Sequence, residues 1–161
     1  MQKLQVFTTG GTIDKVYFDA KSEYEVGEAM IGRILHEVGV TFEFEVAELL
    51  KKDSLDLDEH DRARIHEAVA ACPDKHILIT HGTDTMAETG RQLLDIPGKT
   101  IVLVGSLSPA RFQGSDAVFN IGCAVAAVQT LPPGVYVTMS GRVFEADKVR
   151  KNRDMNRFED A

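Results

Sequence analysis

Two short turns rich in glycine and threonine carry the residues of this sequence that could do chemistry. The first, FTTGGTIDK at residues 7–15, places Thr12 directly after two glycines. The second, THGTDT at residues 80–85, places Thr83 and Asp84 after a glycine. A threonine hydroxyl is a weak nucleophile that becomes useful beside a base and a carboxylate that orients it. The two turns therefore favour a hydrolytic site.

Other interpretations of the two turns explain fewer residues. Backbone N–H groups of the first turn could hold a phosphate, but the turn lacks both the G-x-G-x-x-G and the G-x-x-x-x-G-K-[ST] patterns. In the second turn, Asp84 alone is typical of a helix N-cap, and His81 alone is typical of a hydrogen-bonded structural residue. An N-cap does not explain why Thr80, Thr83 and Thr85 gather around that histidine.

The chemistry of such a site needs a base and an oxyanion site. A lysine can act as the base where burial lowers its pKa and a carboxylate positions it. Backbone N–H groups near Gly11, Gly82 and Thr83 could stabilise the oxyanion. The two cysteines, Cys72 and Cys123, form no C-x-x-C pattern. We therefore expect neither a metal ion nor an organic cofactor.

The composition limits the fold and the partners. The chain has 161 residues, of which 43% are hydrophobic and 27% charged, and this suits one domain over residues 1–161. The net charge of −7 argues against a nucleic-acid partner, and the basic residues within 148–161 are interpreted as a solvated terminus. No apolar run is long enough to span a bilayer, and a first strand near Lys3 leaves no room for a signal peptide. We expect a cytoplasmic protein without membrane contact.

Predicted strands and helices alternate along the chain, and each strand is a short apolar or alternating run. This order predicts an α/β fold, a doubly wound and mainly parallel sheet with helices on both faces. The predicted strands are residues 4–9, 42–50, 76–80, 100–105 and 134–139, and the predicted helices are residues 27–40, 58–72, 84–95 and 115–131. A capping box is expected at Thr85-x-x-Glu88, and a short hairpin or loop at residues 141–149.

The predicted sheet places the candidate residues together. Ligands of such sheets bind beyond the carboxyl ends of the strands. Four segments follow strand ends and should converge on one rim, and three of them combine glycine with serine or threonine. These segments are residues 8–12, 51–54, 80–84 and 105–109.

At this point the residues resemble a known family. TTGGTI and ITHGTDTMAET are similar to the two signatures of the L-asparaginase/glutaminase family, in the right order and about as far apart as expected. Two such signatures are more specific than either alone. The resemblance runs from residue 4 to about residue 158, and further similar segments are residues 53–65, 102–109 and 119–127.

The resemblance implies a threonine-nucleophile amidohydrolase with the asparaginase N-terminal-domain fold, which is of the Rossmann or flavodoxin type. Thr12 matches the nucleophile of the family. Tyr24, in the segment KSEY, matches the tyrosine on a mobile loop that activates and covers the nucleophile. Thr83, Asp84 and Lys151 match a second catalytic set.

The remaining matches are weaker in detail. Lys151 rests on the alignment of VTMSGRVFEADKVRKN to a family strand, hairpin and lysine, and Lys148 is its rival. Asp53 and Ser54 match the residues that hold the α-amino and α-carboxylate groups of the substrate. The other substrate-binding residues that the resemblance implies are Gly11, Gly82 and Ser106. The neighbouring Lys51 and Lys52 could grip a carboxylate or be solvated.

Members of the family are roughly twice as long, with a second, smaller domain and active sites formed between subunits. The resemblance therefore implies that this chain corresponds to the N-terminal domain alone. The main hypothesis is an asparaginase-like hydrolase that converts L-asparagine or a related small amide to the acid and ammonia. The alternative is a catalytically weak or inactive amino-acid-binding or regulatory module. We expect a homo-oligomer, because the apolar helix at residues 115–131 can bury one face in a partner.

Overall fold

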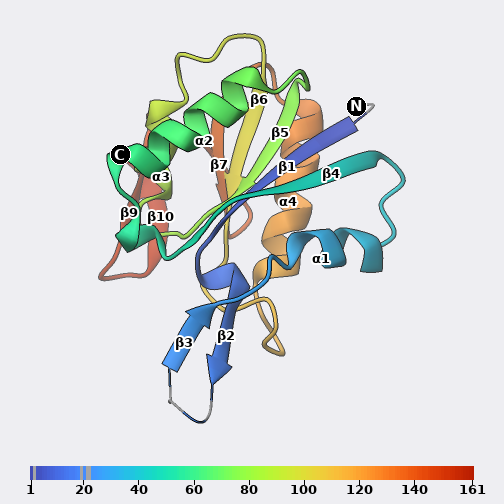
Figure 1. The fold of residues 1–161 in the computed structure, drawn as a ribbon. Helices are drawn as coiled ribbons and strands as arrows, with labels where there is room; N and C mark the ends of the chain where they lie inside the picture. Colours follow the sequence, from blue (N-terminus) through green and yellow to red (C-terminus); the bar gives the residue numbers. More distant parts are fainter. Residues whose placement is uncertain (2, 19, 21–22) are drawn as a thin grey trace.

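A six-stranded sheet forms the centre of the computed structural model, which describes residues 1, 3–18, 20 and 23–161 (Figure 1). Its strands are β1 (Lys3–Gly10), β4 (Glu43–Lys52), β5 (His76–Thr80), β6 (Thr100–Val104), β7 (Gly134–Met139) and β8 (Arg142–Glu145). They lie in the order β4-β1-β5-β6-β7-β8. The first five in this order are parallel, and β8 pairs antiparallel with β7.

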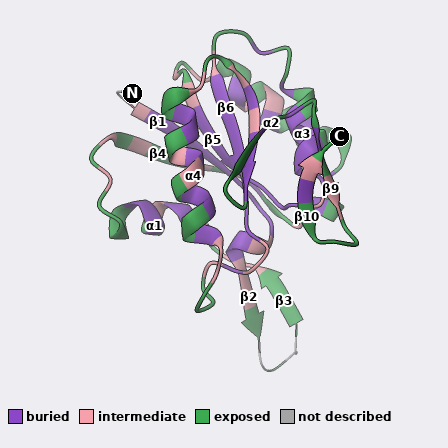
Figure 2. Ribbon diagram, turned by 180° about the vertical axis from the view of Figure 1, so that it is seen from behind, coloured by how far each residue is buried: buried purple, intermediate pink, exposed green. Residues whose placement is uncertain are grey.

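Helices cover both faces of the sheet. They are α1 (Ile31–Glu37), α2 (Glu59–Ala71), α3 (Met86–Gln92) and α4 (Ala117–Thr130). Figure 1 shows α1 and α4 on one face and α2 and α3 on the other. Successive residues of β5 enter opposite cores, since Leu78 packs in the core of α1 and α4 and Ile77 and Ile79 pack in that of α2 and α3. The central strands are therefore buried (Figure 2), and the predicted α/β fold is confirmed.

The strand order identifies the edge of the sheet where a ligand would bind. The chain passes from β1 toward α1 on one face and from β5 toward α3 on the other. The neighbouring strands β1 and β5 therefore form the topological switch point, and a crevice opens beyond their carboxyl ends. Both glycine-rich turns follow these two strands. None of the described helices has the length and apolar character needed to cross a membrane.

Direct backbone contacts join the turns at this edge. Gly11 has φ +89° and ψ −177°, a conformation that is essentially restricted to glycine. A Cβ atom on Gly11 would lie 2.5 Å from the Cα of Gly82, and one on Gly82 would lie 2.5 Å from the Cβ of Ser54. The N–H of Gly11 also donates to the carbonyl of Lys52 at 2.9 Å. The turns after β1, β4 and β5 thus converge as predicted.

The helix α1 is shorter than the predicted helix over residues 27–40. Asp14 binds the chain ahead of it: its backbone carbonyl accepts from the N–H of Gly27 at 2.8 Å, and its carboxylate accepts from the N–H of Met30 at 2.9 Å. These bonds hold residues 27–30 against Asp14, and the helix begins only at Ile31. A tertiary contact therefore sets where α1 begins.

The predicted capping box at Thr85 and Glu88 is wrong. Thr85 is the N-cap of α3 but its side chain makes no capping bond, because its hydroxyl donates to the carbonyl of Ser54 at 2.8 Å. The contact between two rim turns takes precedence over the local cap. A capping box forms instead at α2, between Asp58 and Asp61.

Two hairpins were not predicted. β2 (Lys15–Phe18) pairs with β3 (Glu23–Val26) and projects from the sheet (Figure 2), and β9 (Val149–Asn152) pairs with β10 (Arg157–Asp160). The interpretation of the basic residues within 148–161 as a solvated terminus does not hold for Lys151, which is 8% exposed, but the other four have side chains 56–67% exposed. The apolar Val149 and Phe158 of the same segment are buried in the core beside α3. Residues 141–149, expected to form a short hairpin or loop, contain the single strand β8, which pairs with the preceding strand β7. The turn residues of this β7–β8 hairpin, Ser140 and Gly141, both have positive φ.

The contact at Gly11 leads to a stability prediction. Gly11→Ala should lower the free energy of unfolding by about 2–4 kcal/mol, because the new Cβ meets the Gly82 backbone in a strained conformation. The matched control is Gly122→Ala in α4, where a Cβ meets no heavy atom within 4 Å. That variant should gain about 0.5–1 kcal/mol. Urea unfolding at neutral pH measures both, and an equal effect of the two substitutions would contradict the close contact.

Candidate active site

Lys151 connects β9 to the turn after β5. Its Nζ donates to Thr83 Oγ1 at 2.7 Å and to Asp84 Oδ1 at 2.7 Å. The Lys151 side chain is only 8% exposed, and that of Asp84 is 29% exposed. Arg153 places a second cation 3.8 Å from the same carboxylate oxygen. The structure thus brings together the three residues predicted as one set, and it holds the Lys151 ammonium between a hydroxyl and a carboxylate.

Lys148, the rival of Lys151, lies elsewhere. Its Nζ is 2.6 Å from Glu145 Oε2, and its side chain is 67% exposed. It therefore makes a surface ion pair within three residues of sequence. Such pairs contribute little to stability, and this one has no contact with either threonine turn.

His81 fixes the turn that carries Thr83. The ring is fully buried, with Nδ1 2.7 Å from the carbonyl of Gly82 and Nε2 2.8 Å from the hydroxyl of Thr89. Burial lowers the pKa of His81 to about 4, although the bond to the Gly82 carbonyl acts in the opposite direction. The imidazole is therefore neutral near pH 7, with Nδ1 donating to Gly82 and Nε2 accepting from Thr89. This arrangement holds the Gly82 peptide in one orientation.

Thr12 lies at the wall of a hollow beyond the end of β1. The hollow has a volume of about 290 Å³ and is lined by Thr12, Lys15, Tyr24, Leu107 and Pro109. A neighbouring hollow of about 490 Å³ shares Lys15 and Tyr24 and also includes Asp53. Thr12 and Tyr24 therefore face the same space, as their predicted roles require. Thr83 and Lys151 do not line it, and they adjoin it through the contact between Gly11 and Gly82.

The Tyr24 side chain is half exposed on the hairpin β2–β3. Its ring lies 5.1 Å from the ring of Tyr17 and 6.0 Å from that of Phe112, measured between centroids. These contacts hold the ring at the mouth of the hollow. Lys21 and Ser22, which belong to the KSEY segment, lie outside the described residues.

Asp53 is engaged on both carboxylate oxygens. Its Oδ2 lies 2.6 Å from Lys15 Nζ, and its Oδ1 accepts from the N–H of Leu55 at 3.1 Å. Partial burial acts to raise the pKa of Asp53, but the bonds from Lys15 and Leu55 and the charges of Lys15 and Lys151 outweigh it and lower the pKa.

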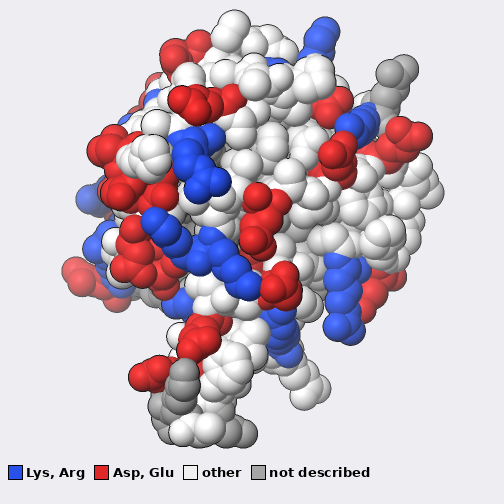
Figure 3. Space-filling model, in the orientation of Figure 1, with Lys and Arg blue, Asp and Glu red and all other residues white. Residues whose placement is uncertain are grey.

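The other predicted binding residues lie at or near the rim. Ser54 and Ser106 are both buried, and the hydroxyl of Ser106 donates to the carbonyl of Ser108 at 2.5 Å. Lys51 pairs with Glu28 at 2.9 Å, and Lys52 pairs with Asp61 at 2.8 Å. Figure 3 shows such basic side chains lying beside acidic ones over the face that it presents. The two lysines thus have acidic partners within the chain.

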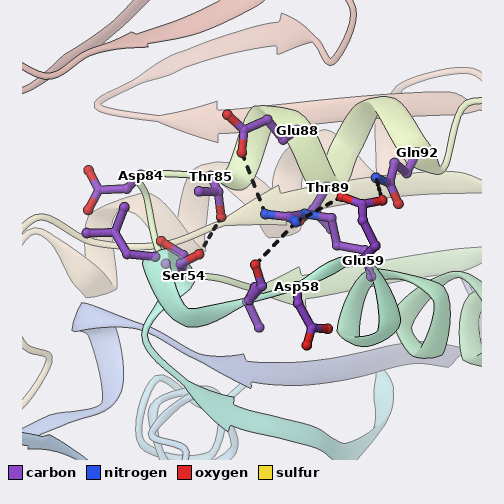
Figure 4. A network of polar contacts seen from close by, with 12 residues as sticks. Ser54, Asp58, Glu59, Asp84, Thr85, Glu88, Thr89 and Gln92 are labelled. Atoms are coloured by element: carbon purple, nitrogen blue, oxygen red, sulfur yellow. Dashed lines mark hydrogen bonds and ion pairs between the residues drawn. The ribbon is translucent and has the colours of Figure 1, made fainter.

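Ser54 links the turn after β4 to the second threonine turn. Figure 4 shows Thr85 directed toward Ser54 across the rim, with Asp84 beside it pointing away from this bond. Because Ser54 also touches Gly82 closely, the turn after β4 is fixed to the turn after β5 at two points. The position of Asp53 relative to Thr83 is therefore set by main-chain contacts.

Sequence reasoning missed Lys15 and the structural role of Asp14, whereas the interpretation of His81 as a hydrogen-bonded structural residue agrees with its buried contacts. Asp14 is buried and Arg111 donates to its backbone carbonyl at 2.9 Å. Its only signal in the sequence is that it follows Thr12 closely. Lys15 lies on the same short segment, and a charged residue so near a predicted nucleophile was a usable signal.

The fold and the site define a doubly wound α/β protein with a threonine–aspartate–lysine cluster at the carboxyl edge of its sheet. The family model for the asparaginase N-terminal region matches residues 3–159, and the chain belongs to the asparaginase family. The predicted resemblance is confirmed.

Individual relatives agree with this. The L-asparaginase of Thermococcus kodakarensis is 33% identical over an alignment 159 residues long, which covers 92% of this chain and 47% of the relative. A solved structure of the thermostable L-asparaginase from that organism has a TM-score of 0.85 at 30% identity, covering 98% of this chain and 51% of the other. L-asparaginase I of Vibrio cholerae has a TM-score of 0.85 at 26% identity, covering 99% and 51%. The chain spans about half the length of the relatives that it matches.

Asp14 and His81 should affect stability in opposite directions as pH changes. Burial raises the pKa of Asp14 to about 6 from 3.8, against the Met30 N–H bond and the charge of Arg111, so its ionisation weakens the fold as pH rises through this window. The pKa of His81 falls from 6.5 to about 4, so its contribution to stability is lost as pH falls through that window. The pH dependence of stability that comes from Asp14 therefore partly cancels the one that comes from His81.

Asp14→Asn separates the effect of Asp14 from that of His81, because it removes the titrating carboxyl group of residue 14. The amide oxygen of the variant can still accept the Met30 N–H, so this hydrogen bond is kept. The difference in unfolding free energy between variant and wild type should change by about 2 kcal/mol between pH 7 and about pH 4.5, with the variant favoured at pH 7. Urea unfolding at both pH values measures it. A difference that does not vary with pH would contradict a raised pKa of the Asp14 carboxyl in the fold.

Proposed function

We propose that this chain is an amidohydrolase of the L-asparaginase type, which hydrolyses a small amide to the acid and ammonia with a threonine nucleophile. The observation that carries the proposal is the nearly buried Lys151, whose Nζ lies 2.7 Å from both Thr83 Oγ1 and Asp84 Oδ1. Burying an ammonium group is costly unless it is paired, and the Thr83 hydroxyl beside the Lys151 ammonium gives this pair a group through which a proton can pass.

The proposed reaction has two steps. The Thr12 hydroxyl attacks the amide carbon, the C–N bond breaks, and ammonia leaves with a proton, so that an ester forms on Thr12. Water then attacks the ester carbon, which releases the acid and regenerates the Thr12 hydroxyl. Lys151 and Thr83 carry protons between the attacking and leaving groups, while Asp84 holds Lys151 in position.

The surrounding residues support these steps. Backbone N–H groups of the turns after β1 and β5, apart from that of Gly11, which donates to Lys52, are proposed to stabilise the oxyanion, since preformed donors act strongly in a partly buried site. Tyr24 is proposed to cover Thr12, because both line the same hollow. Asp53, Ser54 and Ser106 are proposed to position the substrate. The reaction needs no cofactor.

The ammonia released by purified protein from asparagine, glutamine and simple amides tests this proposal. Thr12→Ala should lower kcat/KM by about 1,000-fold or more, because the ester can no longer form. Lys151→Met should lower it by about 100- to 10,000-fold through the loss of proton transfer. The matched control Lys148→Met removes a surface lysine and should leave the rate unchanged.

Full activity in Thr12→Ala or Lys151→Met would overturn the proposal. No release by the wild type from any amide, together with a higher melting temperature in aspartate or asparagine, would favour a binding or regulatory module instead, because a ligand of the native state stabilises it.

We also propose that the protein acts in the cytoplasm as a homo-oligomer. The homo-oligomer is supported by two exposed apolar side chains on α4, Val118 (51% exposed) and Phe119 (61% exposed). Exposed large apolar side chains that lie together are typical of interfaces. Light scattering should therefore give a mass above that of the 17.7 kDa chain. Phe119→Lys should shift it toward the monomer, and a monomer for the wild type would contradict the proposal.

A further inference from the structure

Lys15 is the only charged group among the described residues that line the hollow of Thr12. The other lining residues are Thr12, Tyr24, Leu107 and Pro109, and none of them carries a carboxylate. The side chain of Lys15 is 23% exposed, so its ammonium is accessible from the hollow while being partly withdrawn from water. A ligand in this space therefore meets a fixed positive charge beside the threonine hydroxyl.

Asp53 holds this positive charge in place. The 2.6 Å contact between Lys15 Nζ and Asp53 Oδ2 uses one carboxylate oxygen, and the N–H of Leu55 uses the other. Lys15 is held in addition by the backbone of β2, where it pairs with Val26 across the hairpin. The ammonium of Lys15 thus occupies the position that a ligand ammonium would need in order to reach Asp53.

The second carboxylate near the threonines is also engaged. Asp84 Oδ1 accepts from Lys151 at 2.7 Å and lies 3.8 Å from Arg153 Nε. An ammonium group on a ligand in the hollow of Thr12 would meet the like charge of Lys15 without a carboxylate in that lining, and Asp84 already has Lys151 and Arg153 as cationic partners. Like charges brought together at a binding surface cost several kcal/mol, so the site disfavours ligands with an ammonium group.

We propose that Lys15 is a specificity-determining residue that selects short amides carrying a carboxylate and no α-ammonium group, that is, monoamides of small dicarboxylic acids. This inference rests on the proposed function and names the substrate class of that site. The Lys15 ammonium donates to the carboxylate of the substrate, while Leu107 and Pro109 contact its methylene carbons. The amide then lies toward Thr12 at the other side of the hollow.

The hydrolysis of two probes that differ only in the α-ammonium group tests this proposal. Wild-type protein should hydrolyse succinamate with a kcat/KM at least about tenfold above that for asparagine, as expected for one unfavourable charge contact. Lys15→Gln should change this ratio by about tenfold or more in favour of asparagine, because the substitution frees Asp53 for the substrate ammonium. The control Lys148→Gln should leave the ratio unchanged.

A binding measurement does not depend on turnover. In calorimetric titration, succinate should bind wild-type protein at least about tenfold more tightly than aspartate, and Lys15→Gln should reverse this order. Thermal unfolding of Lys15→Gln checks whether the variant is folded. If the variant does not fold, the comparison of succinate and aspartate binding to the wild-type protein still tests the proposal.

The outcomes separate this inference from the proposed function. Ammonia release with asparagine equal to or better than succinamate would overturn the role of Lys15 and leave the proposed hydrolysis intact. Tighter binding of succinate without release of ammonia from any amide would support the role of Lys15 in recognition and overturn the hydrolysis. Failure of both ligands to bind, with no release, would overturn both.

Discussion

The backbone contact between Gly11 and Gly82 is the constraint on which the candidate site depends. It brings the turn of Thr12 against the turn of Thr83 with no room for a side chain between them. Ser54 packs against Gly82 in the same way, so that the ends of three parallel strands act as one rigid rim. The glycines therefore fix distances between chemical groups, and flexibility is not their role here.

The charged groups of the site are arranged in pairs around this rim. Lys151 is held by Asp84, and Lys15 is held by Asp53, while neutral His81 fixes the peptide between the two turns. Each cation is partly buried and has a carboxylate partner, which keeps its position fixed and limits the cost of removing it from water. The proposed chemistry uses the first pair for proton transfer and the second for substrate selection.

Much of the fold and of the candidate site was predictable from the sequence, and the predictions that failed did so for identifiable physical reasons. Apolar runs such as HILIT predicted buried parallel strands, and the order of strands and helices then placed Thr12 and Thr83 at one edge. The capping box predicted at Thr85 does not form, because the Thr85 hydroxyl donates to the carbonyl of Ser54, 31 residues away in the sequence. The Lys15–Asp53 pair joins segments that only the fold brings together, so no pattern of spacing could reveal it.

The central claim is that Thr12 and Lys151 act as one catalytic unit across the contact between the two turns. A double-mutant cycle on kcat/KM with Thr12→Ala, Lys151→Met and the combined variant tests this most directly, because residues that act as a unit have non-additive effects. The account predicts that the double variant is no slower than the slower single variant. Losses that multiply in the double variant would show that the two residues act independently and would contradict the account.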